Sequence, residues 1–65
     1  MNTTRKALDL VDPLLETRHW ARIISLGEHV YFEAGPIHDN GFEECATTSG
    51  TVQKDGTVTI ANWRI

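Results

Sequence analysis

The sequence lacks most features of secreted and membrane proteins. Its one cysteine, Cys45, cannot form an internal disulfide, which fits a reducing compartment. No apolar run reaches the roughly 18 residues that a membrane span needs. The N-terminal segment leads into Asp9 and Asp12 rather than into the apolar core of a signal peptide. We therefore expect a cytoplasmic protein.

Basic residues are also scarce. Six lysines and arginines stand against nine aspartates and glutamates, which gives a formal net charge of −3. Between Ile23 and Gln53 there is no lysine or arginine at all. Nucleic acids and anionic membranes bind basic surfaces, so we expect neither direct nucleic-acid binding nor membrane association.

The chain is too short for more than one domain. At 65 residues it buries only about 60% of its unfolded surface, so a cofactor domain beside a substrate domain is excluded. We expect a single small α+β domain over residues 1–65, with a net stability of about 3–5 kcal/mol.

Glycine is absent from the first 19 residues, and this part of the chain reads as a helix. Leu8, Val11 and Leu15 recur at helical spacing, with Ala7 and Leu14 beside them. Pro13 lies on the polar side, so the helix either bends there or breaks, with Asp12 capping a second segment. Because the apolar stripe continues in phase through Pro13, the pattern favours one kinked helix from Thr3 to Arg18.

Beyond the helix the period changes to two, which indicates strands. Asp55-Gly56 between β-prone flanks is a strong hairpin signal. Turn residues also occupy 26–28 and 35–41. The chain is therefore predicted to fold as an N-terminal helix packed on a three- to four-stranded antiparallel β-meander. The predicted strands are residues 20–25, 29–34, 42–48 and 57–63. The predicted core is Leu8, Val11, Leu15, Ile23, Val30, Phe32, Val58 and Ile60.

The residues that could carry catalysis or bind a metal do not form a motif. His19, His29, His38 and Cys45 lack the close pairing from which structural zinc sites are built. Cys45 follows Glu43-Glu44, whose negative charge disfavours a reactive thiolate. The glycines match neither phosphate-binding pattern. We expect no metal, no cofactor and no enzymatic activity.

The acidic residues are concentrated in the middle of the chain. Regularly spaced carboxylates on a folded surface can imitate DNA phosphates and bind a basic groove on another protein. This hypothesis requires them to share one solvent-facing patch that Arg18, Arg22 and Lys54 do not neutralise. The alternative is a solvated face that only keeps the protein soluble. The five candidate partner-binding residues are Glu28, Glu33, Asp39, Glu43 and Glu44. Second-rank candidates on the helix are Asp9, Asp12 and Glu16, of which Asp9 is also spaced to pair with Arg5.

Aromatic residues offer a second route to partner binding. Tyr31 and Phe32 are neighbours on a predicted strand, so one of them points away from the core. Trp20 and Trp63 each lie close to an arginine. Tyrosine and tryptophan are common interface anchors, although in so small a fold a tryptophan more often covers the core.

In length, layout and grouping of carboxylates the chain resembles the small phage-encoded anti-CRISPR proteins, most of all inhibitors of the type I-C system. The resemblance covers the whole chain but rests on no shared motif, so it transfers no residue role. It implies a monomer in the host bacterial cytoplasm that binds a CRISPR–Cas effector subunit with a basic DNA-binding groove and blocks target DNA binding. A charge of −3 is weak for a DNA mimic, so steric or conformational inhibition stays open. The alternative is a phage or bacterial interaction module, antitoxin-like or regulator-binding, that acts through aromatic contacts.

Overall fold

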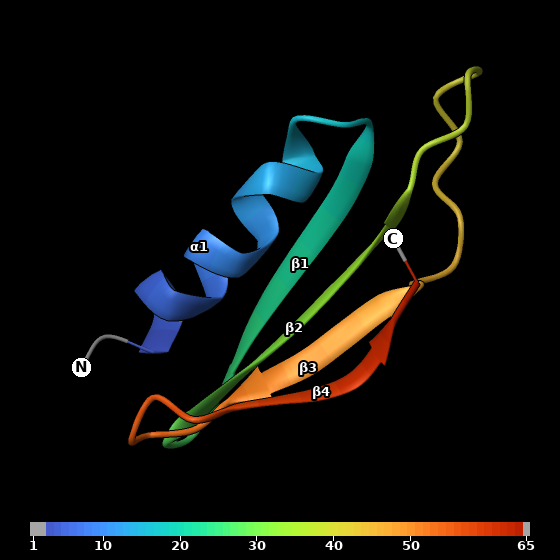
Figure 1. Cartoon of the computed structure of the whole chain (residues 1–65). Helices are drawn as coiled ribbons and strands as arrows, with labels where there is room; N and C mark the ends of the chain where they lie inside the picture. The colour runs from blue at the N-terminus through green and yellow to red at the C-terminus, as the bar shows by residue number, and fades with distance from the viewer. Residues whose placement is uncertain (1–2, 65) are drawn as a thin grey trace.

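The computed structural model describes residues 3–64 and shows one helix lying on one face of a four-stranded antiparallel sheet (Figure 1). The strands are adjacent in chain order, so the sheet is a meander. This confirms the predicted α+β architecture. The elements are α1 (Thr3–Leu15), β1 (His19–Leu26), β2 (His29–Pro36), β3 (Thr48–Val52) and β4 (Val58–Trp63).

The helix is one piece that includes Pro13, as predicted, but it ends at Leu15 rather than at Arg18. Pro13 is exposed, so its ring faces solvent. The Thr17 amide and hydroxyl both donate to the Leu14 carbonyl, at 3.0 and 2.9 Å. Arg18 then adopts a left-handed conformation with φ 60°, which is not helical and turns the chain into β1.

The helix buries a different row from the one predicted. Ala7, Val11 and Leu14 face the sheet, whereas Leu8 is 38% exposed and Leu15 is 49% exposed. Each of these leucines follows a buried residue directly, so it lies about 100° farther round the helix. The predicted stripe was therefore wrong for Leu8 and Leu15. The small side chain of Ala7, fully buried, lets the helix approach the sheet closely.

The two hairpins form where turn residues predicted them. Gly27, at φ 66°, and Glu28 connect Leu26 to His29, which are paired at the end of β1 and β2. Gly56, at φ 91°, belongs to the turn between β3 and β4. Positive φ favours glycine at both turns.

The predicted strand over 42–48 is wrong. Residues 38–47 form a loop, and β3 begins at Thr48. Among the described residues, the one isolated β-bridge of this loop pairs Glu43 with Ile37. Asn40 Oδ1 accepts the Phe42 amide at 3.0 Å and Gly41 has φ 85°, so this segment turns. Phe42 is 64% exposed, so no buried face holds the segment in a strand.

The core lies between α1 and the first three strands. The fully buried Phe32 ring lies over Gly50 of the neighbouring strand, where a Cβ would stand 2.7 Å from Phe32 Cζ. Predicted core residues Val11, Val30 and Phe32 are confirmed, and Ile23 and Val58 are half-buried against them. Sequence reasoning left out Ala7, Leu14, Ala34 and Val52, which are buried.

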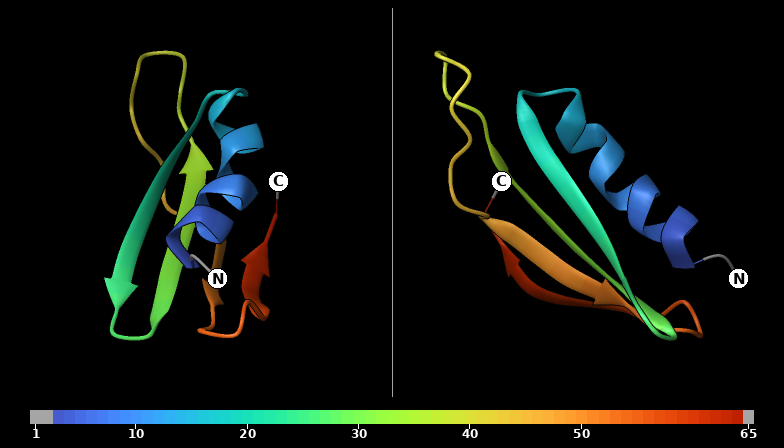
Figure 2. Two further views of the ribbon diagram at one scale, coloured as in Figure 1. Left: turned by 90° about the vertical axis from the view of Figure 1, so that its left-hand side faces the viewer. Right: turned by 180° about the vertical axis from the view of Figure 1, so that it is seen from behind.

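Ile60 was predicted to be buried and is 45% exposed. The reason is the reach of the helix: within residues 3–64, α1 contacts β1, β2 and β3 but not β4 (Figure 2). Part of the helix side of the sheet is therefore uncovered along β4.

Candidate functional site

In the part of the chain that the structure describes, no helix or second sheet covers the sheet face opposite α1, and the β2–β3 loop reaches only its Trp20 end (Figure 2). Val30, Phe32 and Ala34 of β2 face the helix and are buried, so the alternate residues Tyr31 and Glu33 point to the other side. Residues paired across antiparallel strands share a face, which assigns the rest. We call this surface the open face, and its members are Trp20, Arg22, Ile24, Leu26, His29, Tyr31, Glu33, Ser49, Thr51, Thr59 and Asn62.

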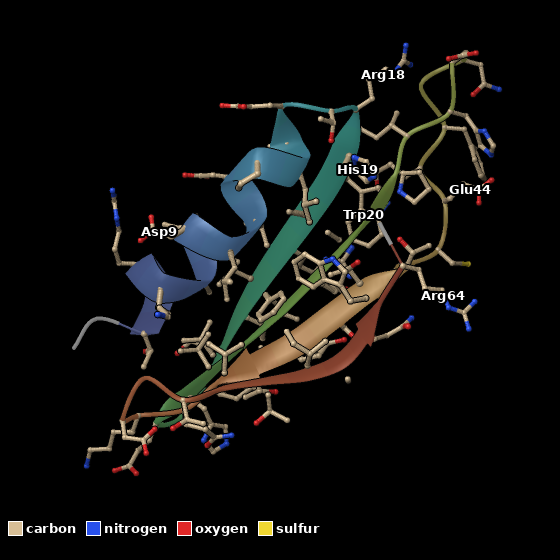
Figure 3. All side chains as sticks on the ribbon, in the orientation of Figure 1. Asp9, Arg18, His19, Trp20, Glu44 and Arg64 are labelled. Carbon is tan, nitrogen blue, oxygen red and sulfur yellow. The ribbon has the colours of Figure 1, made fainter. Side chains whose placement is uncertain are left out.

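Trp20 is held firmly at one end of the open face. It is paired with Gly35, where an added Cβ would come within 2.9 Å of the indole nitrogen. The indole N–H donates to the Glu44 carbonyl at 2.9 Å, which ties β1 to the β2–β3 loop. Figure 3 shows Trp20 and Glu44 at the same end of the molecule. The space left by Gly35, which has no side chain, and the hydrogen bond to the Glu44 carbonyl therefore fix the position of the Trp20 indole.

A polar chain continues from Trp20 across β1 and β2. The Arg22 guanidinium carbon lies 5.7 Å from the Trp20 ring centroid, within the range of a cation–π contact. Arg22 Nη1 donates to Glu33 Oε1 at 3.0 Å, and the Tyr31 hydroxyl donates to Glu33 Oε2 at 3.2 Å. The Glu33 side chain is 17% exposed, so both of its oxygens are used inside the group.

The rest of the open face is neutral. Ser49, Thr51 and Thr59 supply hydroxyls, and Ile24 and Leu26, which are 39% and 51% exposed, supply apolar area. The charges of Arg22 and Glu33 cancel. Aromatic and arginine anchors among small polar groups are typical of protein-binding surfaces. This arrangement can bind a flat partner surface.

The predicted acidic patch does not form, because the five central carboxylates lie in different parts of the molecule. Glu28 is in the β1–β2 turn and Asp39 is in the β2–β3 loop, at opposite ends of the sheet. Glu33 lies between them on the open face. Glu43 and Glu44 were expected on the predicted strand over 42–48, but they belong to the loop. The chain extends 39 Å along its longest axis, so nearness in sequence did not become nearness in space.

Basic residues from outside the acidic stretch pair with most of these carboxylates. Lys54 meets Glu28 at 3.3 Å across the two hairpin turns. Arg22 meets Glu33 at 3.0 Å. Asp39, the third of the set, lies 3.6 Å from a guanidinium nitrogen of Arg18. The hypothesis of phosphate imitation required that Arg18, Arg22 and Lys54 leave the five central carboxylates unpaired. Since all three cations pair with them, these carboxylates do not form the required surface.

The remaining two carboxylates differ. Glu44 pairs with His38, while Glu43 makes no ion pair within residues 3–64. Both stand near the exposed side chain of Phe42 in the loop. Glu43 is thus the one central carboxylate without an ion pair in the described part of the chain, and a single carboxylate cannot imitate a row of phosphates.

The second-rank carboxylates Asp9 and Asp12 lie on the exposed side of α1, and Glu16 directly follows the helix. Asp9 pairs with Arg5 at 3.4 Å, which confirms the predicted i, i+4 pair, and Figure 3 shows Asp9 on the helix. Asp12 and Glu16 are exposed and have no ion-pair partner among the described residues. The sheet separates these residues from the open face, so the two surfaces cannot contact the same flat partner.

Neither tryptophan covers the core, although covering the core is the more common role of tryptophan in so small a fold. Trp20 lies on the open face, and Trp63, at the end of β4, is 44% exposed. The alternation of Trp20, Arg22 and Ile24 signalled a common face for these residues. What the sequence did not show was that this face would be the uncovered one.

No metal-binding group of three histidine, cysteine or carboxylate side chains occurs within residues 3–64. His19 Nδ1 lies 2.9 Å from the Thr17 hydroxyl, and His38 pairs with Glu44. Cys45 is an exposed free thiol. Among the described helices, none is long and apolar enough to cross a membrane.

No protein-family model, curated protein or solved structure gives a significant match to this chain. The open face and the charge pairs described above are therefore the basis for assigning a function.

Proposed function

We propose that the chain is a non-enzymatic binding protein of the bacterial cytoplasm that inhibits a CRISPR–Cas surveillance complex by docking its open face on a subunit of that complex. The partner class follows from the resemblance to anti-CRISPR proteins. The mode of binding is supported by the open face, where Trp20 and Arg22 are held in place before any partner arrives. Side chains fixed in advance lose little entropy on binding, which favours affinity.

Binding through the open face differs from DNA mimicry in what it requires. A phosphate mimic needs unpaired carboxylates on one surface, whereas the central carboxylates are mostly paired and lie in different parts of the molecule. The open face is neutral and partly aromatic. Inhibition would then come from obstruction or from locking a conformation of the complex.

The experiment measures the affinity of the purified protein for a purified type I-C surveillance complex. The variant Ile24→Glu places an unpaired charge in the open face. We expect Ile24→Glu to weaken binding at least about tenfold. The matched control is Lys6→Glu, which introduces the same side chain on the exposed side of α1 and a larger change of net charge, and should bind like the wild type.

DNA mimicry remains the second candidate because Asp12, Glu16 and Glu43 have no ion pair in the described part of the chain. It predicts that binding falls steeply with rising salt and that the charge reversals Asp12→Lys and Glu16→Lys abolish it. The open-face proposal predicts weak salt dependence and near-normal binding by that double variant. Binding to a different bacterial protein, lost in Ile24→Glu, would support the interaction-module alternative. Unchanged affinity in Ile24→Glu would contradict both uses of the open face.

A further inference from the structure

β4 is an edge strand with no charge of its own. Among the strands of residues 3–64 it is hydrogen-bonded only to β3, and its six residues, Val58–Trp63, contain no lysine, arginine, aspartate or glutamate. Natural proteins usually protect edge strands with charged side chains or proline, because an open edge pairs readily with another strand. β1, the opposite edge, carries Arg22 at its centre. The two edges of this sheet are therefore unlike, and β4 is the one without a protecting charge.

An apolar row accompanies this edge on the helix side of the sheet. Val58 and Ile60 are paired with Val52 and Gly50, whose positions face α1. Trp63 is paired with the buried Thr48 and so shares that side. Because α1 does not reach β4, Ile60 and Trp63 remain 45% and 44% exposed. Another strand laid against β4 would cover them.

The charges that flank β4 select the orientation of that second strand. Asp55 precedes the strand and Arg64 follows it, so the two ends carry opposite charges. Asp55 Oδ1 accepts the Thr57 amide at 2.9 Å, which holds the carboxylate near the start of β4. Figure 3 shows Arg64 at the other end. Within residues 3–64 neither residue has an ion-pair partner.

We propose that β4 is a self-association edge, on which a second copy of this chain pairs antiparallel around a two-fold axis near Ile60. Antiparallel pairing places Arg64 of each copy beside Asp55 of the other, whereas parallel pairing would place like charges together. The same axis brings the two Ile60 side chains together and sets Trp63 of each copy against Val58 of the other. The result is a continuous eight-stranded sheet with a helix over each half.

The bulge in β4 is compatible with this pairing. The register changes from Gly50–Ile60 to Ser49–Asn62, which leaves Ala61 as an extra residue. In the proposed dimer, Val58 of one copy lies two positions before Ile60 and faces Trp63 of the other copy, which lies three positions after Ile60. The extra residue Ala61 accounts for this difference of one position. A single strand pair is small beside a stable interface, so we expect a dimer that forms with rising concentration. This differs from the monomer expected from the sequence and does not depend on the proposed function.

The first test is sedimentation equilibrium of the full chain from about 10 µM to about 1 mM, the range in which weak interfaces associate. The wild type should shift from monomer to dimer. Ile60→Lys places a charge in the centre of the edge and should stay monomeric, while Lys6→Glu on the helix should dimerise like the wild type. A wild type that is monomeric throughout this range overturns the proposal. So does an Ile60→Lys variant that still dimerises.

The second test exchanges the flanking charges. Arg64→Glu alone and Asp55→Lys alone each set like charges against each other in a homodimer, so each should weaken self-association about tenfold or more. Mixing the two variants should restore association as a heterodimer, because each end then pairs opposite charges. Circular dichroism establishes that each variant is folded. Failure of the mixture to associate, when the wild type does, would contradict the antiparallel arrangement.

Discussion

Phe32 and Gly50 are paired across β2 and β3, and the aromatic ring occupies the space that a side chain at residue 50 would need. Phe32 is fully buried, so this contact lies at the centre of the core. The contact explains why a glycine stands in the middle of β3, where it would otherwise weaken a strand.

Gly50→Ala should therefore destabilise the fold. The new Cβ would lie 2.6 Å from the Thr59 carbonyl oxygen and 2.7 Å from Phe32 Cζ, and the backbone oxygen cannot move without disturbing β4. We expect a loss of about 1–3 kcal/mol in the free energy of unfolding, measured by urea denaturation. Ser49→Ala, on the neighbouring residue of the open face, is the control and should change stability by less than about 0.5 kcal/mol. Equal stability of the two variants would show that the ring does not occupy this space.

Thr48→Val should stabilise the protein. Thr48 is fully buried, and its hydroxyl is the one buried side-chain polar atom of the described residues without a hydrogen-bond partner. Valine has nearly the same shape and removes the cost of burying that hydroxyl. We expect a gain of about 1 kcal/mol in thermal or urea unfolding. Thr48→Ser, which keeps the hydroxyl and loses the methyl group, should be less stable than the wild type. A less stable valine variant would mean that the hydroxyl has a partner.

Gly35→Ala should release Trp20 and the loop together. The added Cβ would lie 2.7 Å from the Cys45 carbonyl oxygen and 2.9 Å from Trp20 Nε1. In a Trp63→Phe background, where Trp20 is the only indole, we expect its fluorescence to shift as the ring moves into solvent. Hydrogen exchange at Glu44 and Thr47, whose amides bond to Pro36 and Ala34, should become faster. Unchanged fluorescence would show that the ring is not held by Gly35.

The helix and both hairpins could be predicted because their determinants are local. Helical spacing is visible around Val11, and Asp55-Gly56 marks a tight turn by its own chemistry. β3 could not be found in this way. Its segment from Thr48 to Thr51 contains serine and glycine, which are poor strand formers, and Gly50 fits the strand because it makes room for the Phe32 ring of β2. A contact between distant residues decided the local structure.

The distribution of charge shows the same limit. Along the chain, the central carboxylates have no cation among them, and this suggested a single acidic surface. The register of β1 on β2 sets Arg22 opposite Glu33, and the nearness of the two hairpin turns brings Lys54 to Glu28. Cations from other segments thus reach the carboxylates through pairing that no local pattern encodes. The same register created the open face.

The turn before β4 should make stability depend on pH. Hydrogen bonds from the backbone and side chain of Thr57 hold the pKa of the Asp55 carboxyl below its usual value of 3.8. Because the folded state favours the ionised form, Asp55 contributes stability that is present above the unfolded pKa and is lost as pH falls through the folded one. Asp55→Asn cannot ionise and should lack this contribution.

The difference in unfolding free energy between the wild type and Asp55→Asn should therefore favour the wild type near neutral pH and narrow as pH falls below 3.8. Urea denaturation at low protein concentration, where self-association does not contribute, measures this difference. Asp39→Asn is a matched control, since Asp39 caps no backbone amide among the described hydrogen bonds. If the gap between wild type and Asp55→Asn stayed constant from neutral to acidic pH, the Thr57 hydrogen bonds would not depend on the charge of the carboxylate.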